Sequence, residues 1–153
     1  MKVWEKAHQL ALALYEISNT FPREETYGLV SQIRRAASSI PCNIAEGCGR
    51  DGDPELARFW IIARGSASEL EYQLLLARDL KLMLPQDYEK LSEQTVEIKR
   101  MLTVLVQKLK ALNADSARPA ESSTLVAASG RARRLTRGTA SMAAPFRGFL
   151  DVA

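Results

Sequence analysis

The segment Gly47-Cys48-Gly49-Arg50-Asp51-Gly52 is the part of this chain whose residue types most resemble a chemical motif. It matches the pattern G-x-G-x-x-G, in which backbone N–H groups bind a pyrophosphate. That fingerprint requires a strand before the first glycine and a helix that opens within the motif. The residues before Gly47 have the apolar spacing of a helix instead. We therefore interpret the segment as a helix end with left-handed glycines, not as a nucleotide site.

Metal ligands are scarce in the sequence. Two cysteines, Cys42 and Cys48, and the single histidine, His8, cannot complete a tetrahedral zinc site. On one helix the two thiols would point apart, so we expect no disulfide between them. The acidic run Asp51-x-Asp53-x-Glu55 is followed by a leucine where a calcium loop of the EF-hand type needs glycine. The sequence therefore predicts no metal and no cofactor.

No arrangement of residues predicts catalysis. His8 is the only histidine, and nothing in the sequence marks a serine or cysteine as its partner in a nucleophile–base pair. Carboxylates are paired at Glu24-Glu25 and at Glu69 and Glu71, but charges on helix surfaces are usually solvated. We therefore expect that the protein is not an enzyme.

The charge of the chain is divided unevenly. Residues 1–112 carry 15 basic and 15 acidic side chains, whereas residues 113–153 carry 6 and 3 and supply the whole formal charge of +3. A compact part without net charge attracts phosphate only through a local patch, the pore of an oligomer or the tail. The sequence shows neither an apolar run of about 20 residues nor a signal peptide, which predicts a cytoplasmic protein without a membrane span.

Apolar residues recur at every third or fourth position in four stretches, which predict helices. We expect these helices at about residues 2–21, 24–47, 53–83 and 85–112, with a kink at Pro41 in the second. Short connections between long helices favour an all-α, antiparallel up-down-up-down four-helix bundle.

After residue 112 the helical spacing stops. Residues 113–153 are rich in Ala, Ser, Arg and Gly, and we expect them to form a disordered C-terminal tail outside the domain of residues 1–112. The tail contains a basic run at residues 130–138. Near its end it contains three large apolar residues, Phe146, Phe149 and Leu150.

The third predicted helix carries more apolar surface than one bundle core can cover. One stripe with helical spacing is suited to the core: Leu56, Phe59, Ala63, Ser66, Leu70, Gln73, Ala77, Leu80 and Leu84. A second stripe lies on another face: Ala57, Ile61, Gly65, Ser68, Tyr72, Leu75 and Leu82. Small residues in both stripes would let neighbouring backbones approach closely. We predict that the second stripe is the interface of a homo-oligomer.

Four polar residues are predicted to act together. Asn43 and Glu46 flank the apolar seam of the second helix, and Arg58 and Glu69 adjoin that of the third. Buried charge is tolerated when it is paired. We therefore expect a hydrogen-bonded set near Pro41 that fixes the register of the two helices; a ligand site is the alternative.

Several segments of the sequence resemble a known family. In the second helix they are Tyr27-Gly28-Leu29-Val30-Ser31-Gln32-Ile33-Arg34-Arg35-Ala36-Ala37 and Ile40-Pro41-Cys42-Asn43-Ile44-Ala45-Glu46-Gly47. In the third they are Arg58-Phe59, Gly65-Ser66-Ala67-Ser68-Glu69-Leu70-Glu71 and Gln73-Leu74. Together they resemble the four-helix-bundle family first found as open reading frames in intervening sequences of bacterial 23S ribosomal RNA genes. The likeness covers about residues 2–112 and leaves out the tail.

The resemblance implies a four-helix bundle that assembles into a homopentamer. A related branch, the accessory variability protein of diversity-generating retroelements, is a pentameric barrel that binds nucleic acid and a reverse transcriptase. Carried over to this chain, the likeness makes five arginines candidates for a basic surface or pore lining: Arg34, Arg35, Arg50, Arg58 and Arg64. That branch is distinctly basic, whereas residues 1–112 here are neutral.

We therefore expect a non-enzymatic homo-oligomer that acts as an accessory protein bound to RNA or DNA. The alternative is a scaffold or adaptor whose partner is another protein. Retention of RNA with a steep salt dependence would favour the first hypothesis. Recovery of a specific protein without nucleic acid would favour the second.

Overall fold

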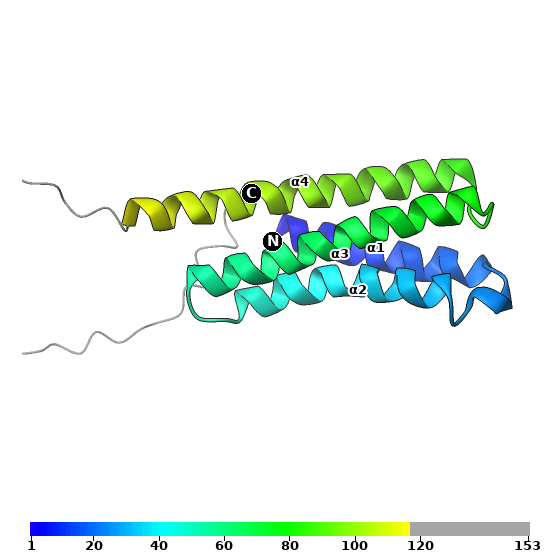
Figure 1. Ribbon diagram of the computed structural model, residues 1–153, viewed down its shortest axis with the longest axis horizontal. Coiled ribbons are helices and arrows are strands. Elements are labelled where there is room, and N and C mark those ends of the chain that lie inside the picture. The colour runs from blue at the N-terminus through cyan, green and yellow to red at the C-terminus, as the bar shows by residue number, and fades with distance from the viewer. Residues whose placement is uncertain (117–153) are drawn as a thin grey trace, which may run out of the picture.

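The structure, a computed structural model, describes residues 1–116 and consists of four helices. These are α1 (Lys2–Ile17), α2 (Leu29–Cys48), α3 (Asp53–Asp79) and α4 (Pro85–Ser116). Figure 1 shows the helices side by side along one long axis, and the chain turns back at an end of the bundle after each of the first three. The described residues contain no strand. The predicted all-α, antiparallel four-helix bundle is confirmed.

Helix ends differ from the predicted ones where turns interrupt the apolar spacing. α1 ends at Ile17, and a 3-10 turn at Ser18–Thr20 takes the place of the predicted continuation. A second 3-10 turn, Arg23–Glu25, occupies the residues predicted to open α2. α4 continues to Ser116, so residues 113–116 extend the bundle and do not begin the tail. The predicted disorder of the remaining tail concerns residues outside the described part of the chain.

α3 ends at Asp79, not near Met83 as predicted, because its last turn closes on a left-handed residue. The N–H of Leu82 donates to the carbonyl oxygen of Ala77 at 2.9 Å, and Lys81 between them has a φ of 60°. This is the hydrogen-bond pattern of a Schellman end, where glycine usually takes the left-handed position. A lysine gives no such signal in the sequence, so the apolar spacing alone overestimates the length of the helix.

The core runs along the bundle axis and draws on all four helices. In α1 and α2 the buried residues follow the predicted seams: Val3, Ala7, Leu10, Leu14, Val30, Ile33, Ala37, Ile40 and Ile44. In α4 they include Leu91, Thr95, Ile98, Leu102 and Leu109. Helical spacing therefore identifies the buried face of these three helices correctly.

On α3 the buried face agrees with the predicted seam at Ala63, Leu70, Gln73 and Ala77 and differs from it elsewhere. It consists of Ala57, Trp60, Ala63, Ala67, Leu70, Gln73, Leu74 and Ala77. The predicted residues Leu80 and Leu84 are exposed, and Leu56, Phe59 and Ser66 are only half-buried. Trp60, absent from both predicted stripes, is 1% exposed and ranks first by volume among the fully buried side chains. The alanines on the same face of α3 leave the room that its indole ring needs.

The connector between α2 and α3 shows what its glycines do. Gly52 precedes the first residue of α3 with a φ of 91°, a conformation that favours glycine. Gly49 has a φ of −90°, so the predicted left-handed conformation is wrong there. Gly47 lies inside α2, where an added Cβ would be 2.9 Å from Cβ of Phe59 and 3.3 Å from the carbonyl oxygen of Leu56. Helix geometry and packing therefore account for the glycine pattern.

α2 continues as one helix through Pro41, the site of the predicted kink. Side chains make hydrogen bonds around this turn: Nδ2 of Asn43 donates to the carbonyl oxygen of Ser39 at 2.8 Å and to its Oγ at 3.0 Å. Oγ of Ser39 also lies 2.9 Å from Oγ of Ser66 on α3. This short polar chain ties α2 to α3 beside the proline.

Gln73 is a polar residue of the core with an unsatisfied atom. Its Nε2 donates to Oε1 of Glu69 at 3.2 Å, but its own Oε1 is buried and has no hydrogen-bond partner among the described residues. An unpaired buried acceptor costs about 1–3 kcal/mol. We expect Gln73→Leu to raise the free energy of unfolding by about 1 kcal/mol in chemical denaturation. Gln107→Leu, at an exposed position of α4, should change it by less than about 0.5 kcal/mol; a destabilised Gln73→Leu protein would show that the amide oxygen is satisfied.

Candidate functional site

Exposed apolar residues follow one side of α3, away from its buried face. Ile61 and Tyr72 are 37% and 63% exposed, and Gly65 and Ser68 lie exposed between them. We call Ile61, Gly65, Ser68 and Tyr72 the outer face of α3. No atom lies within 4 Å of the position that a Cβ of Gly65 would take. Because an interior helical glycine costs about 1 kcal/mol relative to alanine, the fold of the single chain does not explain this residue.

The other three residues of the predicted interface are placed differently. Ala57 belongs to the bundle core, so its assignment to the interface is corrected. Leu75 is half-buried. Leu82 packs against the core at the end of α3. The predicted stripe therefore reduces to the four residues of the outer face, with Ile62, 41% exposed, beside them.

Arg34 joins α2 to the end of α1. Its Nε donates to Oγ of Ser18 at 2.8 Å, and its Nη2 donates to Oδ1 of Asn19 at 2.8 Å and more weakly to the carbonyl oxygen of Tyr15. The guanidinium also lies over the Tyr15 ring, 5.1 Å from its centroid. Arg34 thus has a structural role in the bundle, because it ties α2 to the turn that follows α1.

Arg35 on α2 contacts α3, and Arg64 on α3 contacts α4. Arg35 forms an exposed ion pair with Glu69 on α3. Arg64 reaches across to α4, where its Nη1 lies 3.5 Å from Oγ1 of Thr103. Together with Arg34, these residues lie at the α1–α2, α2–α3 and α3–α4 contacts of the single chain. The predicted basic surface or pore lining of an assembly stays a prediction.

Arg50 and Arg58 are the two predicted arginines that the structure brings together. Their guanidinium groups lie 5.3 Å and 5.8 Å from the centroid of the same ring, that of Phe59. Each also pairs with a carboxylate on its own side: Arg50 with Glu46, and Arg58 with Glu55. The Glu46 carboxylate raises the pKa of Arg50 above its ordinary value through a hydrogen bond and through its charge. We call Arg50, Phe59 and Arg58 the arginine–phenylalanine cluster.

The predicted polar set does not form. Asn43 bonds to Ser39, Glu46 to Arg50, Arg58 to Glu55 and Glu69 to Arg35, so no two of its four members pair with each other in the contacts found. The charged members are also 41% to 66% exposed, which removes the need for mutual pairing in a buried site. The prediction was wrong because long charged side chains extend to solvent and pair with their nearest surface partner.

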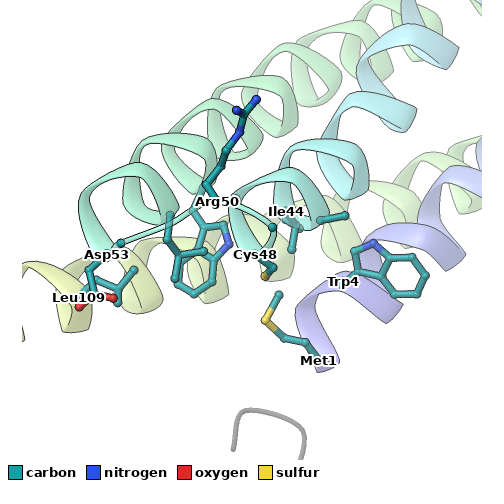
Figure 2. A pocket seen from close by; sticks show the side chains of 13 residues that line it. Met1, Trp4, Ile44, Cys48, Arg50, Asp53 and Leu109 are labelled. Atoms are coloured by element: carbon teal, nitrogen blue, oxygen red, sulfur yellow. The ribbon is translucent and has the colours of Figure 1, made fainter. Parts of the chain in front are cut away.

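A pocket of about 560 Å³ lies where the start of α1 meets the α2–α3 corner and α4. Sequence reasoning missed it. Its walls are mainly apolar and include Met1, Trp4, Ile44, Leu56, Trp60 and Leu109. Figure 2 shows Cys48 and Met1 with their sulfur atoms at the middle of the pocket, whereas the side chain of Arg50 points away from it. The one signal in the sequence was that both tryptophans of the chain, Trp4 and Trp60, lie toward the starts of their helices.

Cys48 and Trp60 give the pocket its two weakly polar atoms. Burial raises the pKa of the Cys48 thiol above its ordinary value, although the N-terminal ammonium and the Trp60 N–H act in the opposite direction. The Trp60 N–H does not reach hydrogen-bond geometry with any partner among the described residues, and its Nε1 atom is buried. A thiol in such surroundings is a poor nucleophile at neutral pH.

Within residues 1–116, no three His, Cys, Asp or Glu side chains gather in a way that could hold a metal ion. No described helix is long and apolar enough to cross a membrane. His8 is exposed and stacks on Trp4, with ring centroids 5.3 Å apart.

The fold and surface define a class of protein: a small all-α bundle with an apolar outer face and an apolar end pocket. The family of 23S rRNA-intervening sequence proteins matches residues 1–104, and the chain belongs to this family. A solved protein of unknown function from the S23 ribosomal protein family of Bacteroides thetaiotaomicron superposes with a TM-score of 0.64 at 24% identity. The superposition covers 68% of this chain and 97% of that one. Among curated proteins no match is found.

Proposed function

We propose that this protein is a non-enzymatic, self-associating bundle that acts in the cytoplasm as an accessory protein bound to RNA. The outer face of α3 is the observation that carries the proposal. Membership of a family named for 23S rRNA intervening sequences supports RNA as the nucleic acid. The assembly is a homo-oligomer, and a pentamer is the form that the family resemblance implies.

Self-association follows from the energetics of the outer face. Ile61 and Tyr72 leave apolar surface in water, and each square ångström of such surface that becomes buried contributes about 25 cal/mol. Gly65, with open space at its Cβ position, lets the backbone of a second helix approach closely. Exposed large apolar side chains on either side of two small residues are suited to the close packing of a second helix.

RNA binding is assigned to the arginine–phenylalanine cluster. An aromatic ring flanked by guanidinium groups is suited to unpaired bases and phosphates, which stack on rings and pair with arginine. Both arginines are more than half exposed, at 53% and 66% for Arg50 and Arg58, so solvent weakens their carboxylate pairs and the pairs are easily exchanged for phosphate. One cluster on a neutral bundle binds weakly. Repetition of the cluster in each subunit of an assembly strengthens the binding by avidity.

Arg50→Gln with Arg58→Gln tests this assignment. The double variant should retain less labelled RNA than the native protein, and the dependence of binding on salt should become shallower, because fewer phosphate contacts release fewer counterions. The measurement is retention of a labelled single-stranded RNA over a salt series. Arg34 is unsuitable for this experiment because its loss would also disturb the junction of α1 and α2.

Arg78→Gln is the matched control. Arg78 is also exposed, stacks on a ring, that of Tyr88, and pairs with a carboxylate, that of Asp79, at the other end of α3. Its loss should leave RNA retention unchanged. Equal losses in the control and the double variant would contradict the assignment to the cluster. An assembled native protein that retains no RNA at low salt would support the scaffold hypothesis, in which the partner is another protein.

A further inference from the structure

The end pocket exists because α1 is short. α1 has 16 residues and α4 has 32, so their lengths are about 24 Å and 48 Å. Figure 1 shows that α1 starts well inside the bundle, whereas the α2–α3 corner and α4 extend further at that end. Beyond Met1 the bundle therefore has three helices where elsewhere it has four, and the inward side chains of those three helices line the pocket.

The walls of this pocket favour an apolar peptide over a charged ligand. Trp60 and Ile44 are fully buried members of the core, and Trp4 at the rim is 37% exposed. The nearest ammonium, that of Met1, is paired with Glu5, and the Arg50 side chain points away. Nε1 of Trp60 is a buried polar atom of the wall without a hydrogen-bond partner among the described residues, and a peptide carbonyl oxygen could accept from its N–H.

We propose that the pocket binds the C-terminal segment of the same chain, residues 145–152, with Phe146, Phe149 and Leu150 against its apolar walls. These three residues have the spacing i, i+3, i+4, which places them on one face of a helix. Pro145 before them suits the first position of a helix. In this proposal residues 145–152 bind as a short amphipathic helix, and the pocket is the groove that receives its apolar face beyond the start of α1.

The tail leaves the bundle at the right end and is long enough. Leu109 lines the pocket, and Ser116 lies seven residues further along α4, a distance of about 10 Å. Between Ser116 and Pro145 lie 28 residues, enough to reach across about 10 Å in any backbone conformation. Tethering at this length corresponds to an effective concentration of the order of 1 mM, which allows a weak contact to be populated.

Thiol reactivity of Cys48 in the full chain provides the test. In a Cys42→Ser background, which removes the exposed cysteine, Cys48 is the only thiol. Replacing Phe146, Phe149 and Leu150 by serine should increase its rate of modification by a neutral thiol reagent roughly tenfold, as expected for a covering segment that is bound about nine-tenths of the time. Acrylamide quenching of the two tryptophans, which both line the pocket, should increase in parallel.

One further variant and two controls show whether the protection depends on this segment and on this pocket. Leu125→Ser with Val126→Ser makes the same kind of change elsewhere in the tail and should leave both readouts unchanged. Ala45→Glu places a carboxylate at an exposed position of the pocket wall and should reproduce the effect of the triple variant, whereas Ser31→Glu, exposed further along α2, should not. Circular dichroism should show that the helices of the bundle are retained in all of them, because Ala45 and Ser31 are exposed; the triple variant and Ala45→Glu should lose at most the signal of the eight-residue segment itself.

The proposal would be overturned by equal Cys48 reactivity in the native chain and the triple variant. It would also be overturned, in its intramolecular form, by protection that disappears on dilution, because a segment tethered to its own bundle binds independently of protein concentration. Protection that persists across the dilution series and is lost only with the three apolar residues or with Ala45→Glu supports it.

Discussion

Replacing Ile61 and Tyr72 by glutamate is expected to convert the self-associated protein into a folded monomer. Both side chains lie on the outer face of α3 and are exposed in the single chain, so the change leaves the bundle core intact. At an interface between copies, each glutamate would bury an unpaired charge, which costs about 3 kcal/mol or more. The association constant should therefore fall by at least about a hundredfold per site. Sedimentation velocity gives the mass, and circular dichroism gives the helix content.

A control must separate the interface from a general effect of added charge. Leu12→Glu with Tyr27→Glu makes the same change in charge at two other exposed apolar positions, which are 52% and 96% exposed. This variant should keep the native mass. A native protein that sediments as a monomer at high concentration would contradict the proposed self-association. Loss of helix content in the Ile61→Glu, Tyr72→Glu variant would show instead that the outer face belongs to the core.

The spacing of apolar residues was sufficient to predict the fold. In α2, for example, Val30, Ile33, Ala37, Ile40 and Ile44 recur at three and four positions and are all buried. Such a pattern identifies the buried face of the helix without ambiguity, because only one face is apolar. The end of α2 and the starts of α3 and α4 were predicted to within about one residue, because glycine or proline marks them. The end of α3 was misplaced because Lys81 takes the left-handed position that the sequence does not advertise.

On α3 the spacing of apolar residues identified only part of the buried face. Apolar side chains are segregated less sharply on α3 than on α2, because its outer face carries Ile61, Ile62 and Tyr72. A shift of one residue along a helix rotates the chosen face by about 100°. The sequence therefore did not decide which stripe faces the core, and neither predicted stripe included Trp60. The ambiguity itself was informative, since it came from the second apolar surface that the proposed interface uses.

The candidate site was less predictable than the fold. Arginine residues could be counted from the sequence, but the partners of Arg34 and Arg35 depend on which helix ends and carboxylates come within reach after packing. The end pocket depends on how far the start of α1 lies from the end of α4 along the bundle axis. That offset cannot be read from the residues of either helix alone. Neither feature has a local pattern of residues.

The two helical glycines, Gly47 and Gly65, provide the second large predicted effect, because alanine should act in opposite directions at them. At Gly47 the new Cβ would meet Cβ of Phe59 at 2.9 Å and the carbonyl oxygen of Leu56 at 3.3 Å, and backbone cannot move aside cheaply. Overpacking of this kind costs about 1–3 kcal/mol. We expect Gly47→Ala to lower the free energy of unfolding by about 1–2 kcal/mol, since the gain in helix propensity offsets part of the cost. Chemical denaturation measures the change.

At Gly65 nothing lies within 4 Å of the new Cβ, so alanine should add about 0.5–1 kcal/mol of stability to a single chain. If a helix of another copy packs closely on this residue, the same methyl group should weaken the assembly. The comparison is therefore made in two backgrounds, the native protein and the Ile61→Glu, Tyr72→Glu monomer. A gain in the monomer together with weaker association in the native protein locates the close contact at Gly65. Equal gains in both backgrounds would show that the outer face of α3 remains in water at this position, and the interface would then have to lie elsewhere on the bundle.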